Sequence, residues 1–257
     1  MDLKLAGKTA LITGGSRGLG RYSAIALASE GCNVSICGRG EEDLKKTETD
    51  LKALGIQVAS IQCDVTTEAG TSKAYEQTKQ LLGPIDILIN NVGGHIGRDF
   101  DSADDKSWDH TFQLNLFSAI RLIRLCLPEM KTRSWGRILN ISSIYGREYG
   151  GGMTYMTSKA SLIAFSKHLA IQLAKTGVTV NTIAPGSIAF YGGSWQRFQD
   201  EKSTTEVDDF IANNLPMGKF GWPEPIGSLV AFLASEHAGL ITGTAINVDG
   251  GQSKSLI

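Results

Sequence analysis

Short, almost continuous apolar runs alternate along the chain with longer segments in which apolar residues recur at helical spacing. Such runs are typical of strands buried on both faces, as in a parallel sheet covered by helices. The runs that predict strands are residues 8–13, 33–37, 57–64, 86–90, 136–141, 178–183 and 244–248. The segments that predict helices are residues 19–29, 41–54, 71–82, 108–126 and 155–175. With right-handed crossovers, this order predicts an α/β fold: a Rossmann-type doubly wound parallel sheet of about seven strands with helices on both faces.

One stretch, residues 187–220, does not follow this alternation. It contains Gly192-Gly193, Trp195 and a polar run, and it follows the sixth predicted strand. A long excursion inside a compact domain is usually functional, often as a lid over a ligand, although a merely decorative insertion is the alternative. We expect residues 1–257 to form a single domain with a substrate lid at about 187–220.

The composition of the chain excludes several classes of binding partner. The net charge is −1, and lysines and arginines are spread along the chain, which argues against binding to nucleic acid. No apolar run approaches the ~18–20 residues that a membrane span needs, and the first residues lack the apolar segment of a signal peptide. The four cysteines show no CxxC spacing, as in reduced cytosolic proteins. We therefore expect a cytoplasmic protein that acts on a small molecule, without nucleic acid, membrane or metal.

A glycine-rich turn joins the first predicted strand to the first helix. In this turn Gly14 permits the tight bend, Gly18 lets the backbone approach a pyrophosphate, and Gly20 lets helix and strand pack closely. The free N–H groups at the start of the helix then receive the phosphate charge. The predicted phosphate-binding residues are Gly14, Ser16, Arg17, Gly18, Leu19 and Gly20. The strand before and the helix after the turn favour a dinucleotide site over a structural loop.

The end of the second strand indicates which dinucleotide is bound. An acidic residue there would bond the ribose 2′-hydroxyl of NAD, but this chain has Arg39, with no carboxylate until Glu41. Arg39 can pair with a 2′-phosphate, and Arg17 can reach the same group. We therefore expect NADP(H) as the cofactor, with NAD(H) as the alternative if both arginines are solvated surface residues.

Tyr155 and Lys159 are four residues apart near the start of a predicted helix, so they project from one face. A free tyrosine has a pKa near ~10, and lowering it by about 3 units takes roughly 4 kcal/mol. An ammonium group ~4 Å away supplies about that much at an effective dielectric constant near ~20. The spacing therefore predicts a tyrosine base that a lysine activates.

Polar residues follow two neighbouring strands at the edge where α/β sheets bind their ligands. Ser142 and Ser143 end the fifth strand and can donate to a substrate carbonyl. The turn that contains Asn91 and Gly93 ends the fourth strand. Asn115 interrupts an apolar helical stripe, either as a buried residue that the backbone satisfies or as a link from a water chain to Lys159.

The chain resembles the short-chain dehydrogenase/reductase family from end to end. The matching pieces are Thr13-Gly14-x3-Gly18-x-Gly20, Asp64-Val65, Asn90-Asn91-x-Gly93, Asn115, the serine pair, Tyr155-x3-Lys159, Pro185-Gly186 and Val248-Asp249-Gly250-Gly251. The resemblance implies a catalytic tetrad of Asn115, Ser143, Tyr155 and Lys159, and a homotetramer assembled through long helices and the C-terminal segment. It also implies that Asp64 and Val65 seat the adenine, that Lys159 bonds the nicotinamide ribose, and that Pro185, Gly186 and Ile188 flank the nicotinamide.

Two positions depart from the family pattern. The Ser-x-x-Gly turn assigns the catalytic role to Ser143, but the usual count of thirteen residues to the tyrosine points to Ser142. Phe190 stands where the family often carries a threonine that bonds the cofactor's carboxamide. The resemblance then leaves that contact to Ser187 or to a backbone group.

The substrate is open at this stage. Residues on the segments expected to surround it are His95, Arg98, Arg147, Glu148, Tyr149, Tyr191, Trp195 and Arg197. The basic ones suit an anionic substrate such as an acyl thioester, or they are surface charges. Within the family the chain is most similar to the 3-oxoacyl-thioester reductases. We expect hydride transfer between NADP(H) and a carbonyl or secondary alcohol, with two alternatives: an NAD-dependent alcohol or sugar dehydrogenase, or a non-catalytic dinucleotide-binding protein.

Overall fold

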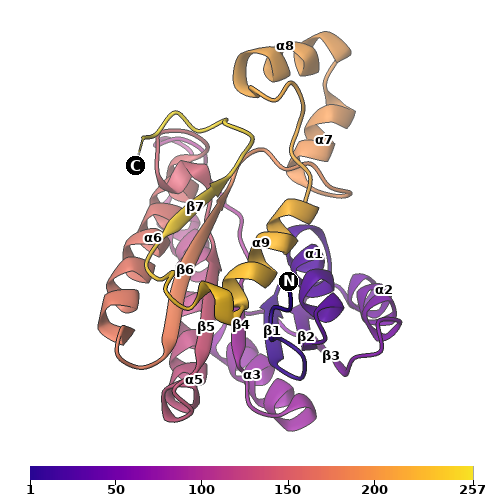
Figure 1. The fold of residues 1–257 in the computed structure, drawn as a ribbon. Coiled ribbons are helices and arrows are strands. Elements are labelled where there is room, and N and C mark those ends of the chain that lie inside the picture. The colour runs from indigo at the N-terminus through magenta and orange to yellow at the C-terminus, as the bar shows by residue number, and fades with distance from the viewer. Residues whose placement is uncertain (257) are drawn as a thin grey trace.

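A seven-stranded parallel sheet forms the centre of the computed structural model, which describes residues 1–256. The strand order is β3-β2-β1-β4-β5-β6-β7, so the chain reverses its direction across the sheet between β1 and β4 (Figure 1). The strands are β1 (Thr9–Thr13), β2 (Asn33–Gly38), β3 (Val58–Gln62), β4 (Ile87–Asn90), β5 (Gly136–Ile141), β6 (Val178–Pro185) and β7 (Ala245–Val248). Ligands of open α/β sheets bind at such a reversal, beyond the carboxyl ends of the strands. The predicted fold class is confirmed.

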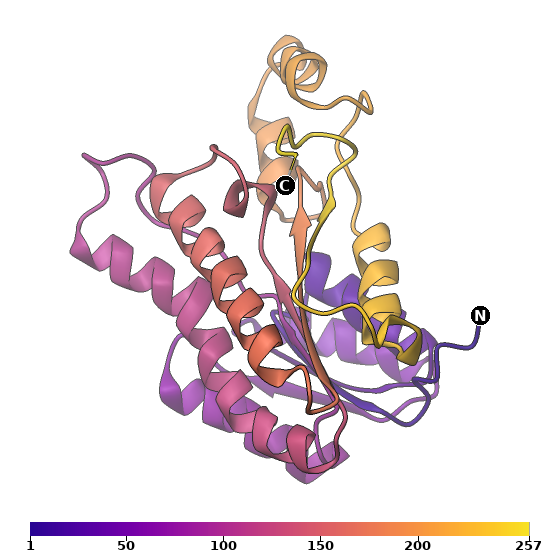
Figure 2. The ribbon, with the colours of Figure 1, turned by 60° about the vertical axis from the view of Figure 1, so that its left-hand side comes forward.

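Helices cover both faces of the sheet, as Figures 1 and 2 show. One apolar core joins the sheet to α1 (Gly18–Ser29), α2 (Glu41–Lys52) and α9 (Glu224–Ala234). The other core joins it to α3 (Glu68–Leu82), α5 (Ser118–Thr132) and α6 (Met153–Leu173). Burial on both faces explains why the strand sequences are apolar at successive positions: all five residues of β1 are buried.

The helix predicted over residues 108–126 is in fact three segments. It consists of α4 (Asp105–Phe112), a π-helical turn over Gln113–Phe117, and α5, which continues through Pro128 to Thr132. A π turn leaves no simple trace in an apolar stripe, and a proline inside a helix, such as Pro128, is uncommon. Within residues 1–256, no helix combines the length and the apolar character that crossing a membrane requires.

The segment 187–220, the lid segment, contains two helices that the apolar pattern does not predict. It holds α7 (Ser194–Glu201) and α8 (Thr204–Asn214), which stand above the carboxyl end of the sheet (Figures 1 and 2). Neither helix has a fully buried residue, so the apolar periodicity of a core helix is weak. Ser203 and Glu206 form a capping box at the start of α8, which is a local helix signal.

Candidate active site

The glycine turn after β1 has the geometry that its sequence predicts. Gly14 and Gly18 have φ angles of +62° and +54°, which side chains on L-residues disfavour. A Cβ at Gly20 would lie 2.3 Å from the Gly14 carbonyl oxygen, so only glycine allows this approach of helix and turn. Asn91, at the end of β4, donates from Nδ2 to the carbonyls of Thr13 and Gly14 and holds the turn from the other side.

The N-terminus of α1 suits an anion. Its N-cap residue is Arg17, no side chain caps the helix, and the first turn contains no acidic residue. The N–H groups of this turn therefore lack the usual side-chain acceptor and point toward the edge where a phosphate would lie. This uncapped helix start fits the diphosphate of a dinucleotide.

The predicted adenosine end lies at the carboxyl ends of β2 and β3. Arg17 and Arg39 are exposed there, and neither forms an ion pair among the described residues. The Ser16 Oγ is 3.3 Å from the position a Cβ would take on Gly38, which brings the glycine turn against β2. Val65 is buried, and Asp64 accepts from the backbone and hydroxyl of Thr66.

The surroundings of Asp64 favour its charged form. Burial acts to raise the pKa of this carboxyl, but the two Thr66 hydrogen bonds and the nearby Arg39 charge lower it overall. The predicted adenine-binding pair and the predicted 2′-phosphate arginine therefore occupy one corner of the molecule.

Lys159, Asn115 and Gly93 meet below the carboxyl end of the sheet. A Cβ on Gly93 would lie 2.9 Å from Lys159 Nζ and 3.2 Å from Asn115 Oδ1. Lys159 is 2% exposed and donates from Nζ to the carbonyl of Ile141 at the end of β5. Glycine at position 93 is what allows the lysine and the asparagine to share this space.

Asn115 sits in the π turn and is satisfied by backbone, one of the two roles its sequence position suggested. Its side chain accepts from the Gly94 N–H, donates to the Gly94 carbonyl and donates to Ser158 Oγ. Ser158 was not predicted from the sequence. It lies 43 residues away on α6, and nothing in the local pattern marks it.

Ser143, rather than Ser142, faces Tyr155. The Ser143 side chain lies near enough to the Tyr155 phenol to lower its pKa, whereas Ser142 Oγ donates to the backbone carbonyl of Lys159 and is thereby occupied. Ser143 also caps the short 3-10 turn Ile144–Gly146, accepting from the N–H of Tyr145. The family's Ser-x-x-Gly spacing thus identifies the serine that faces the tyrosine, and the count of thirteen does not.

The predicted effect of Lys159 on Tyr155 is wrong for this structure. Burial raises the pKa of the Tyr155 phenol, Ser143 lowers it, and Tyr145 raises it slightly further. The lysine instead responds to its own burial, which lowers its pKa to about 7. Its Nζ is 5.7 Å from the tyrosine ring centre and bonds to Ile141, so a partly neutral amine at that distance supplies little field.

The residues expected around the substrate divide into three groups. His95 packs on the tyrosine, with ring centres 5.5 Å apart, and its pKa is lowered by burial and by Arg98. Arg147 and Glu148 serve the structure instead: Arg147 donates to Ala245 and Asn247, and Glu148 accepts from the C-terminal tail, through Ser253, Lys254 and Ser255. The side chains of Arg98, Tyr149, Tyr191 and Arg197 are exposed, and Trp195 packs within the lid segment.

The predicted nicotinamide segment leaves the sheet after β6. Gly186 is again a position without room for a side chain, because its Cβ would lie 2.7 Å from both Asp249 and Gln252. Gln252 accepts from the Ser187 N–H and donates to its hydroxyl, a two-point clamp that the sequence did not reveal. The backbone N–H and the hydroxyl of Ser187 are thereby both bonded to Gln252, while Pro185 and Ile188 are buried.

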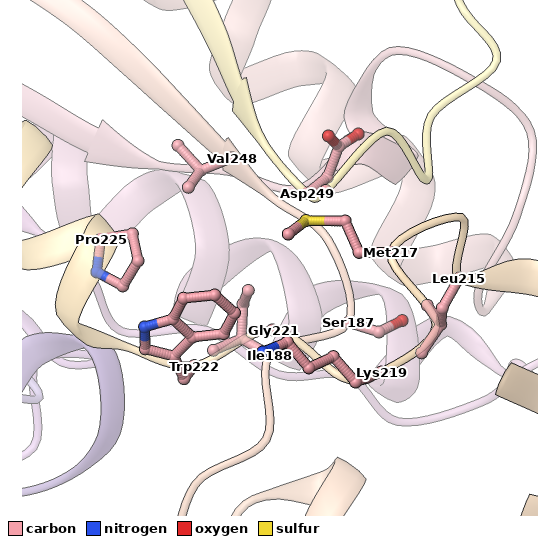
Figure 3. A pocket seen from close by; sticks show the side chains of 11 residues that line it. Ser187, Ile188, Leu215, Met217, Lys219, Gly221, Trp222, Pro225, Val248 and Asp249 are labelled. Atoms are coloured by element: carbon pink, nitrogen blue, oxygen red, sulfur yellow. The ribbon is translucent and has the colours of Figure 1, made fainter.

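A cavity of about 160 Å³ borders Ser187 and Ile188 and excludes Tyr155, Ser143 and Lys159. Figure 3 shows Trp222 and Pro225 on one side of it and Met217 on the other. Its walls come from the end of the lid segment, the start of α9 and the end of β7. It therefore adjoins the predicted nicotinamide segment without being part of the tyrosine site.

Fold and site together define a class: a dinucleotide-binding α/β protein with a serine, a tyrosine and a lysine grouped beside the glycine turn. The model of the short chain dehydrogenase family matches residues 8–201, and the chain belongs to this family. Within residues 1–256, no group of three or more His, Cys, Asp or Glu side chains is arranged to hold a metal ion.

Relatives of known name cover nearly the whole chain. The 3-oxoacyl-(acyl-carrier-protein) reductase FabG of Aquifex aeolicus is 36% identical over 98% of this chain and 99% of its own length. The D-beta-hydroxybutyrate dehydrogenase of Cupriavidus necator is 34% identical over 96% and 98%. Among solved structures, L-sorbose reductase of Gluconobacter frateurii, complexed with NADPH and L-sorbose, superposes with a TM-score of 0.90 at 31% identity and full coverage of both chains.

Proposed function

We propose that this protein is an NADP(H)-dependent reductase of a carbonyl substrate, in which Tyr155 delivers the proton and Ser143 holds the carbonyl oxygen. The observation that carries the proposal is the grouping of Ser143 and Tyr155 at the carboxyl end of the sheet, with Lys159 buried behind them. When bound, NADPH supplies the hydride. The protein's own groups then bind the carbonyl, polarise it and provide a proton to the oxygen.

Tyr155 carries the proton that a general acid must donate. With a pKa raised by burial, the phenol keeps its proton at neutral pH and can give it to an oxygen that is becoming negative. The Ser143 hydroxyl can donate to the same oxygen, which stabilises developing charge. Lys159, with a pKa of about 7, is poised to replace the proton from the interior side, with Asn115 fixing the adjoining Gly94 backbone. In the alcohol-oxidising direction the same residues act in reverse order.

The choice of NADP(H) rests on the two unpaired arginines at the adenosine corner and the absence of a carboxylate at position 39. The NADPH in the sorbose reductase complex supports it. For the substrate, the relatives span a 3-oxoacyl thioester, a hydroxy acid and a sugar, so we propose a ketone or secondary alcohol and favour the 3-oxoacyl thioester.

Tyr155→Phe tests the chemical role. General acid help is worth ~10²–10⁴-fold, so we expect kcat/KM on the best substrate from a panel of ketones and thioesters to fall by that factor. NADPH binding, measured by its fluorescence, should stay within about twofold of the parent protein. Tyr75→Phe, which removes a hydroxyl on α3 that bonds to Glu129, is the matched control. Turnover of Tyr155→Phe within about threefold of the parent protein would exclude the proposed mechanism.

The cofactor is tested separately by comparing kcat/KM for NADPH and NADH. A charge-assisted bond contributes about 1.5–3 kcal/mol, so Arg39→Ala should weaken NADPH use by at least about tenfold and leave NADH use almost unchanged. A parent protein that prefers NADH, or an Arg39→Ala protein that loses both cofactors equally, would refute the assignment of Arg39.

A further inference from the structure

Phe190 lies directly on the glycine turn. A Cβ built on Gly18 would be 2.5 Å from Phe190 Cε2 and 2.6 Å from Cζ, so the ring edge rests on the backbone of Gly18. The same two ring atoms also lie 2.9 Å from the Cβ position of Gly193. One edge of the phenyl ring therefore packs against two glycines, one from the cofactor turn and one from the lid segment.

This position conflicts with an open diphosphate site. The lack of a side chain at Gly18 is what permits a pyrophosphate to approach the start of α1. In this structure the phenyl ring takes up that space. An apolar ring cannot accept hydrogen bonds from the N–H groups of the helix start, so it covers the anion site without replacing the anion.

The backbone around Phe190 divides into a fixed part and a turn. Before it, Ala189 donates to the Gly221 carbonyl and Gly221 donates to the Ser187 carbonyl, which ties the lid segment's entry to its exit. After it, Gly193 donates to the Phe190 carbonyl, and Gly192 has a φ angle of +73°. The turn over residues 190–193 is thus short, contains two glycines, and is the part of the lid segment that touches the cofactor turn.

We propose that Phe190 gates the diphosphate end of the cofactor site: its ring covers Gly18 and must leave this position when the dinucleotide binds. The inference rests on the proposed function, because it takes NADP(H) as the ligand. It adds that cofactor binding moves the turn over residues 190–193, and with it the start of α7. Since only the fraction of molecules with the ring displaced can accept the diphosphate, the gate slows association and weakens the apparent affinity by that fraction.

Phe190→Ala and Phe190→Leu test the gate by stopped-flow association of NADPH. We expect the association rate constant of Phe190→Ala to rise at least about fivefold, and that of Phe190→Leu to rise less, because leucine keeps part of the cover. Tyr191→Ala is the matched control: its side chain is on the same turn, is 93% exposed and should change the rate by less than about twofold. Urea unfolding of each variant checks that the fold is retained.

A second ligand tests whether Phe190 affects only the diphosphate part of the cofactor site. Adenosine 2′-monophosphate carries the adenine and the 2′-phosphate but lacks the diphosphate, so its affinity, measured by calorimetry, should be equal in all variants within about twofold. Unchanged NADPH association in both Phe190 variants would overturn the gate, as would loss of NADPH binding with intact adenosine 2′-monophosphate binding, since the ring would then be a clamp. A parent protein that binds neither ligand would instead refute the proposed cofactor.

Discussion

Lys159 combines deep burial with the absence of a carboxylate partner among the described residues. Its ammonium group donates to the Ile141 carbonyl, and burial lowers its pKa to about 7. A lysine in this state costs the folded protein free energy, because the chain must give up a proton or bury a charge. Its retention at such a cost is typical of a functional residue.

The free-energy cost of burying Lys159 predicts how the stability of the protein depends on pH. The folded-state pKa lies below the usual value of 10.5, so no penalty exists above about pH 10.5, and the penalty grows as the pH falls toward 7. We expect Lys159→Met to raise the free energy of unfolding of the cofactor-free protein by about 4 kcal/mol at pH 6.5 and about 1 kcal/mol at pH 9.5.

Urea unfolding at the two pH values measures this difference. Lys167→Met, which alters an exposed lysine on the same helix, should change stability equally at both pH values. An Lys159→Met protein with the same stability change at pH 6.5 and 9.5 would show that the buried amine is not the cause.

Among the elements, the π turn between α4 and α5 controls the loop after β4. Its extra residue turns Asn115 inward, where one side chain supplies both a donor and an acceptor to Gly94. These bonds tie the loop that carries Gly93 and His95 to the helix layer, in addition to the bonds that Thr111 and Thr154 make with the backbone of residues 96 and 97. π turns occur often at functional sites, and here the turn fixes the backbone beside Lys159.

Removing these bonds singly should have graded effects. Asn115→Ala loses three hydrogen bonds and leaves buried backbone groups unpaired, so we expect the free energy of unfolding to fall by about 3 kcal/mol. Ser158→Ala loses one bond to Asn115 and should cost about 1 kcal/mol. Denaturant unfolding gives both values, and amide exchange of residues 92–96 should speed up more in Asn115→Ala. Equal effects of the two substitutions would contradict this account.

What the sequence predicts well are elements with a single dominant signal. The central strands β1, β4, β5 and β6 are predicted because every one of their residues is buried, and the glycine turn because Gly14, Gly18 and Gly20 have separate steric reasons. The clamp from Gln252 and the bond from Ser158 were missed because they join residues that are far apart in the chain, and the π turn because it leaves no simple trace in an apolar stripe. The effect of Lys159 on Tyr155 was wrong because spacing gives proximity but not burial, and burial decides both pKa values.

At the scale of the molecule, the lid segment has a small core of its own. Trp195, Phe198, Phe210 and Phe220 pack together, with ring centres 4.9–6.4 Å apart. Helices α7 and α8 contribute nothing to the two cores on the faces of the sheet. The lid segment and the sheet are therefore stabilised by different contacts.

Trp195→Ala tests whether the lid segment unfolds independently of the sheet. We expect faster tryptic cleavage within residues 194–214 but a change of less than about 1 kcal/mol in the main urea transition, because the sheet cores are untouched. Gln196→Ala, at the neighbouring position on α7, is the control and should alter neither. A large drop in the main transition for Trp195→Ala would mean that the lid segment unfolds together with the sheet.

The aromatic core of the lid segment is separate from the two cores of the sheet. The lid segment can therefore accept substitutions that would destabilise the rest of the chain. Substitutions on the outer faces of α7 and α8 cost the sheet nothing, so selection can test new surfaces above Tyr155 while the proton-handling residues stay in place. A library confined to residues 194–214 should therefore retain a high proportion of folded members, and variation in substrate among relatives of this chain should concentrate in this segment.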